Sequence, residues 1–184
     1  MKQISDFFYS ISSGRAALLA LGVFIVFTAT VLPQQAEKAS VYSGDAGSPD
    51  ASFFYSRDDL YQMAETYGEA GRSAYIRARF GFDVIWPLVY LFFLGTSLSW
   101  VLVGLIPEGN CMRFLNLFPA MGWLFDLLEN IFASIVMANY PNQTMVVDAL
   151  TPIFTSVKWF FVNGSFVILA TVFLMMLWKR VRSS

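Results

Sequence analysis

Three polar side chains lie at helical spacing inside an apolar stretch of the sequence. Asp126, Glu129 and Asn130 occupy positions i, i+3 and i+4, so a helix presents them on one face. The run that carries them, residues 114–140, is otherwise mostly apolar and long enough to cross a membrane. Because a charged side chain at the centre of a membrane helix costs at least about 2.5 kcal/mol, this face must turn toward other helices.

A basic side chain and a further acid stand in two other apolar runs. Lys158 lies about a turn and a half inside the run 153–178, and Asp83 directly precedes the run 84–106. An ammonium at membrane depth is tolerated when a carboxylate faces it. The sequence therefore predicts an ion pair between Lys158 and Glu129, with Asp83 at the outer rim.

Three arginines, Arg72, Arg77 and Arg79, precede Asp83. Guanidinium groups suit carboxylates and phosphates, so one hypothesis is that they hold the anionic head group of a ligand. The alternative is local pairing, of Arg79 with Asp83 and of Arg72 with Glu69, which would only fix the packing of helices. The candidate ligand-binding residues are Arg72, Arg77, Arg79, Asp83, Asp126, Glu129, Asn130 and Lys158.

The composition excludes several kinds of chemistry. The chain has no histidine and one cysteine, Cys111, which excludes zinc sites and catalytic triads that use histidine and also paired-thiol redox sites. Three oxygen-bearing residues at helical spacing are only a weak indication of a magnesium site. We therefore expect neither a metal nor a resident cofactor. A net charge of -1 gives no basic surface for nucleic acid, which is not an expected partner.

The elements that must position these residues are membrane helices. Of the 184 residues, 57% are hydrophobic and 14% are charged, against roughly 25% charged in soluble domains. The sequence predicts an all-α membrane protein: a single integral domain over residues 1–184, with four transmembrane helices in a bundle. The apolar runs are residues 16–32, 84–106, 114–140 and 153–178.

The segment between the first two runs, residues 33–81, is expected to lie outside the membrane. It begins as a loop because Pro33 ends the first run and Gly, Ser, Pro and Asp follow. A short amphipathic helix is expected after Ser56, since Ser56 and Asp59 have the spacing of a capping box. The basic residues that follow Trp178 favour a cytoplasmic C-terminus, and with it a cytoplasmic N-terminus. We expect the plasma membrane of a bacterium or an archaeon.

Three hypotheses of function remain open on the sequence. The leading one is an outward-facing polar cavity within the membrane that binds a lipid or another amphiphilic ligand. The second is an accessory or assembly subunit of a larger membrane complex, with residues 33–50 as a docking arm to other membrane subunits. The third is a small intramembrane enzyme or proton-coupled carrier, in which Asp126 and Glu129 share a proton.

Overall fold

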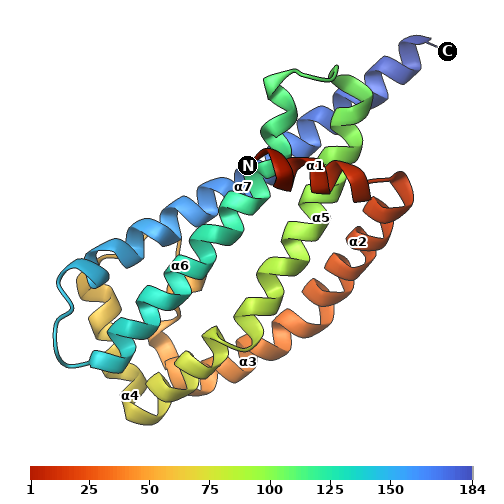
Figure 1. Cartoon of the computed structure of the whole chain (residues 1–184). Coiled ribbons are helices and arrows are strands. Elements are labelled where there is room, and N and C mark those ends of the chain that lie inside the picture. Colours follow the sequence, from red (N-terminus) through yellow and green to blue (C-terminus); the bar gives the residue numbers. More distant parts are fainter. Residues whose placement is uncertain (184) are drawn as a thin grey trace.

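The computed structural model describes residues 1–183 of the chain. Within this range the structure is helical, with no strand (Figure 1). Four helical segments are long and apolar enough to cross a membrane, as an all-α, multi-pass membrane protein requires. These segments are Gly14–Ala46, Arg57–Leu105, Cys111–Asn139 and Val146–Arg182.

The first long helix extends well beyond Pro33, so the predicted loop start at this proline is wrong. Helix α2 (Gly14–Val26) continues through a π-helical turn, η1 (Phe27–Val31), into α3 (Leu32–Ser43). In the π turn the amide of Leu32 donates to the carbonyl of Phe27. Pro33 therefore falls in the first turn of α3, where its missing amide proton and its ring are tolerated.

Helix α4 (Arg57–Arg79) begins with the predicted capping box and is longer than the expected short helix. The amide of Asp59 donates to Ser56 Oγ at 3.1 Å, and the amide of Ser56 donates to Asp59 Oδ2 at 2.7 Å. At Gly68 the backbone has φ 62° and ψ -179°, a conformation that essentially only glycine adopts. This break kinks α4 between its two halves.

Three helices pack side by side to form the centre of the molecule: α5 (Phe82–Leu105), α6 (Phe118–Asn139) and α7 (Val146–Ser183). The third span starts with a 3-10 segment, η4 (Cys111–Leu117), so α6 itself begins four residues later than the apolar run at 114. Helix α7 is longer at both ends than the run 153–178. A Cβ on Gly122 of α6 would lie 2.9 Å from a methyl carbon of α7, so this glycine allows the two helices to approach closely.

A short helix that the sequence analysis did not predict, α1 (Lys2–Ile11), lies across one end of these helices (Figure 1). The side chain of Asn116 binds it, because its amide donates to the carbonyl of Ser5 at 3.2 Å and its oxygen accepts from Ser5 Oγ at 2.9 Å. The same amide also donates to Ser99 Oγ on α5, at 3.0 Å. The C-terminal end of α7 lies at this end of the molecule, and α4 lies at the opposite end.

Two apolar clusters border the polar stripe of α6. Toward the α4 end, Ala133 and Val136 belong to a buried cluster with Leu60 and Tyr75. Toward the α1 end, Trp123 packs against a second cluster around Leu94. The acids between these positions therefore lie in the interior with apolar layers on either side.

Candidate functional site

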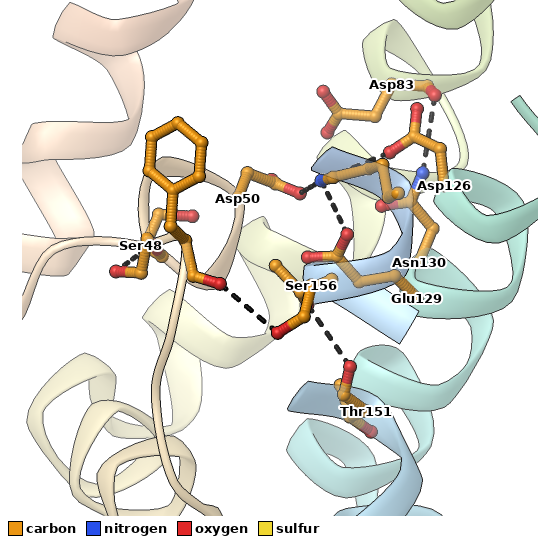
Figure 2. Close-up of polar contacts among 12 residues, drawn as sticks. Ser48, Asp50, Asp83, Asp126, Glu129, Asn130, Thr151 and Ser156 are labelled. Carbon is orange, nitrogen blue, oxygen red and sulfur yellow. Dashed lines mark hydrogen bonds and ion pairs between the residues drawn. The ribbon is translucent and has the colours of Figure 1, made fainter. Parts of the chain in front are cut away.

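Six charged side chains meet where the loop after α3, the junction of α4 with α5, and the middle of α6 and α7 come together. Figure 2 shows Asp50 reaching from the loop toward Asp126 and Glu129 on α6, with Asp83 above them. We call this group the ionic cluster, and its members are Asp50, Arg79, Asp83, Asp126, Glu129 and Lys158.

Lys158 lies at the centre of the ionic cluster and is 5% exposed. Its Nζ is 2.5 Å from Glu129 Oε2, so the predicted pair of Lys158 with Glu129 is confirmed. The same nitrogen is 3.4 Å from Asp126 Oδ1 and 3.4 Å from Asp50 Oδ1. One ammonium group from α7 thus contacts carboxylates from α6 and from the loop between α3 and α4.

Arg79 is the second cation of the cluster and is also buried. Its Nη2 is 2.9 Å from Asp83 Oδ2, which confirms the local pairing considered from the sequence. Its Nη1 pairs with Asp50 and lies 3.5 Å from Asn130 Oδ1, to which it donates. Asn130 in turn donates to the backbone carbonyl of Asp83 at 3.4 Å, so α4, α5 and α6 are connected at one point.

The three arginines of the sequence analysis do not converge. In the described part of the chain, Arg72 donates to the carbonyl of Ala64 at 2.9 Å and lies over the ring of Tyr140, instead of pairing with Glu69. Arg77 is exposed on the surface of α4. Of the three, Arg79 is the one placed at the cluster, and this leaves the polar stripe of α6 with fewer basic neighbours than expected.

Asp50 is a member of the cluster that the sequence analysis missed. It sits in a 3-10 turn, η3 (Pro49–Ala51), in a segment read only as a loop. Its carboxylate contacts both Arg79 and Lys158. No periodicity surrounds it, and its partners are remote in sequence, so nothing local in the sequence distinguishes Asp50 from Asp45.

Hydrogen bonds hold this loop over the helices. Tyr67 donates its hydroxyl to the carbonyl of Gly47 at 2.6 Å, and Ser156 Oγ donates to the carbonyl of Phe53 at 3.3 Å. The hydroxyl of Tyr55 lies 2.9 Å from Thr155 Oγ1 on α7. Burial raises the pKa of Tyr55 above its ordinary value, and the nearby negative charge of Glu129 raises it further. The tyrosine therefore stays neutral and able to donate.

A cavity of about 540 Å³ opens beside the ionic cluster. Its two ends differ in chemistry. Charged side chains form one end: Asp50, Arg79, Asp83, Asp126 and Lys158. Apolar and aromatic side chains line most of the rest, among them Phe24, Phe82, Trp86, Val162 and Phe166, and smaller polar side chains such as Ser40, Ser43 and Asn163 also belong to the lining.

The walls of this cavity come from two separate parts of the chain. Helix α2 packs on α5, and α7 packs on α6 and α5, so α2–α3 and α7 flank the cavity. Ala36 and Ser40 on α3 and Phe166 on α7 belong to the lining and are exposed. The cavity therefore reaches the surface of the helices between α3 and α7.

Three carboxylates of the cluster are close enough to hold a metal ion. Oxygen atoms of Asp50, Asp126 and Glu129 lie within 4.8 Å of one another. Lys158 Nζ, however, contacts the same three groups. The ammonium of the chain itself therefore supplies the positive charge that a metal would bring to this point.

A function for this chain must be argued from the geometry of the cluster and the cavity, because similarity to known proteins gives no information on it. Comparison of the chain with known protein families, with curated proteins and with solved structures gives no match.

Proposed function

We propose that this chain is a multi-pass protein of a bacterial or archaeal plasma membrane, and that it binds an amphiphilic, lipid-like ligand in the cavity between α3 and α7. The observation that carries the proposal is the cavity itself, with its charged end and its apolar walls. Its volume of about 540 Å³ lies within the range of roughly 300–1,000 Å³ that is usual for small-molecule sites.

The two ends of the cavity match the two parts of an amphiphile. Phe24, Val162 and Phe166 offer an apolar surface to a hydrocarbon chain, and burial of such a chain is favourable by about 25 cal/mol per Å². The charged end suits a polar head group, because its side chains would replace the hydrogen bonds that the head group makes to bulk water. The exposed residues between α3 and α7 give a chain a path from the lipid into the cavity.

The proposed arrangement is a four-helix transmembrane bundle with both termini in the cytoplasm. Lys179, Arg180 and Arg182 at the end of α7 support this orientation, because basic residues close to a span favour the cytoplasmic side. The loop that carries Asp50 is then external. The cavity below it belongs to the outer half of the membrane.

The experiment compares two substitutions of alanine by phenylalanine in one helical segment. Ala39 lines the cavity, whereas Ala29 is exposed in the π turn and does not line it. Native mass spectrometry of protein purified in mild detergent would measure lipid that stays bound. We expect bound lipid on the wild type and on Ala29→Phe, and its loss from Ala39→Phe. Equal retention by both variants, or no bound lipid on the wild type, would contradict the proposal.

A further inference from the structure

We infer that the head group taken by this cavity is cationic, so that the ligand is an amphiphilic amine whose ammonium binds between Asp126 and the hydroxyl of Tyr90. This inference rests on the proposed function and specifies the ligand. It replaces the anionic head group expected from the arginines in the sequence.

The first argument is the charge balance of the ionic cluster. Four carboxylates face two cations, Arg79 and Lys158. With all groups ionised, the cluster has an excess of two negative charges. Buried charges without compensation are strongly unfavourable, so this site gains from a further positive charge.

The second argument concerns which carboxylate is left over. Arg79 binds Asp83 and Asp50. Lys158 is closest to Glu129, at 2.5 Å, and contacts Asp126 at 3.4 Å. Within the described residues Asp126 has one ion pair, at 3.4 Å, compared with 2.9 Å for the pair of Asp83 with Arg79, and its side chain lines the cavity. Among the carboxylates of the lining it is therefore the one with the weakest ion pair.

The third argument is an unsatisfied hydroxyl in the same place. Tyr90 is 4% exposed and lines the cavity, and its hydroxyl has no hydrogen bond of ordinary geometry within the described residues. The carboxylate of Asp126 acts on it electrostatically and as a weak hydrogen-bond partner. Buried polar groups are nearly always hydrogen-bonded. An ammonium between them would donate to the carboxylate of Asp126 and to the oxygen of Tyr90.

The aromatic lining also suits a cation. Phe82, Trp86, Tyr90 and Trp159 belong to the lining, and aromatic rings attract cations through their negative faces. Trp159 already lies 5.2 Å from the ammonium of Lys158. An anionic head group would instead face the carboxylates of Asp50, Asp83 and Asp126, while the two basic side chains are already engaged.

The test uses three probes that share one hydrocarbon chain: dodecylamine, dodecanol and dodecanoate. Binding to the full chain in lipid nanodiscs at neutral pH can be followed through tryptophan fluorescence, since Trp86 and Trp159 line the cavity. We expect dodecylamine to bind at least about tenfold more tightly than dodecanol, as one additional charge-assisted contact predicts. Dodecanoate should bind most weakly.

Two variants connect this preference to the named residues. Asp126→Asn should lose about tenfold in amine affinity and keep its dodecanol affinity. Tyr90→Phe, which preserves the ring, should weaken binding of the amine severalfold. This variant tests the inference if the Asp126→Asn protein does not fold. The control is Asp58→Asn, because Asp58 lies on the surface of α4 with its side chain 92% exposed, and it should bind all probes as the wild type does.

The outcomes separate this inference from the proposed function. Equal binding of amine and alcohol, or tighter binding of dodecanoate, would overturn the cationic head group and leave the cavity as an amphiphile site. Amine binding that is unchanged in both Asp126→Asn and Tyr90→Phe would also overturn it. Failure of all three probes to bind would overturn the inference and the proposed function together.

Discussion

At the scale of single residues, Lys158 is the centre on which the ionic cluster depends. Its ammonium is buried and contacts Asp50, Asp126 and Glu129, which come from two separate parts of the chain. Removal of one partner from a buried ion pair leaves an uncompensated charge and costs about 3–5 kcal/mol of stability. The cluster is thus sensitive to single substitutions.

A double-mutant cycle on Lys158 and Glu129 tests this contact. We expect Lys158→Met and Glu129→Gln each to lower the unfolding free energy by about 3–5 kcal/mol. The double variant should be more stable than the sum of the two single losses predicts, because the charge left by one substitution is removed by the other. Unfolding in mixed micelles gives the free energies. Strictly additive losses would show that the two residues do not interact.

A comparison of two nearby arginines tests the different roles assigned to them. Arg79→Gln should destabilise the protein by about 3–5 kcal/mol, since it leaves Asp83 without its cation and Asp50 with Lys158 alone. Arg77 is exposed on the same helix, so Arg77→Gln should change the unfolding free energy by less than about 0.5 kcal/mol. Thermal unfolding of the two purified variants provides the measurement. Similar melting temperatures would contradict the burial of Arg79.

The sequence predicted those parts of the site that helical periodicity determines. Asp126, Glu129 and Asn130 share a buried face because their spacing places them there, and the depth of Lys158 identified Glu129 as its partner. Asp50 could not be predicted, because it joins the cluster through a loop whose path depends on contacts with distant helices. The contacts of Arg72 could not be predicted either, since its partners are a backbone carbonyl and an aromatic ring.

At the scale of the elements, the helices approach one another where glycine leaves room. A Cβ on Gly95 of α5 would lie 2.5 Å from a ring carbon of Phe8 on α1. Phe8 is buried in the apolar cluster around Leu94, whose side chains restrict the movement of its ring. Gly104, on the same helix, has no neighbouring atom within 4 Å of such a Cβ.

These two glycines give a matched prediction. Gly95→Ala should lower the unfolding free energy by about 1–3 kcal/mol through overpacking, and protease cleavage after Lys2 or Arg15 should become faster as α1 detaches. Gly104→Ala should leave both the melting temperature and the cleavage rate close to those of the wild type. A stable Gly95→Ala protein with protected α1 would show that α1 does not pack on α5.

Two helical features, the continuation of the first long helix through Pro33 and helix α1, were not predicted from the sequence, and each has a physical reason. Pro33 usually marks a helix end, and only the shifted hydrogen bonds of the π turn allow the helix to continue through it. Helix α1 lies outside the apolar runs, so a search for spans passes over it. The capping box at Ser56 was predictable, because both of its hydrogen bonds form between residues three positions apart.

At the scale of the whole molecule, α1 and the C-terminal part of α7 lie at the same end of the structure, and α4 lies at the other (Figure 1). Cys111 is exposed and belongs to η4, close to α1. In intact cells, a thiol reagent that does not cross membranes should leave Cys111 unlabelled. The same reagent should label Asp45→Cys in a Cys111→Ser background, since Asp45 is exposed in the segment between α3 and α4, which the proposed topology places outside the cell. The reverse pattern of labelling would invert the proposed topology.

The order in which the helices are synthesised gives the ionic cluster a consequence for membrane insertion. Helix α6, with Asp126 and Glu129, leaves the ribosome before α7 supplies Lys158. Until then the two acids have no ammonium partner at membrane depth, at a cost of about 2.5–3.5 kcal/mol for a central aspartate alone. We therefore expect the third helix to be held less firmly in the bilayer until the fourth arrives. A nascent chain arrested before Val146 should then be degraded faster by quality-control proteases than the full chain.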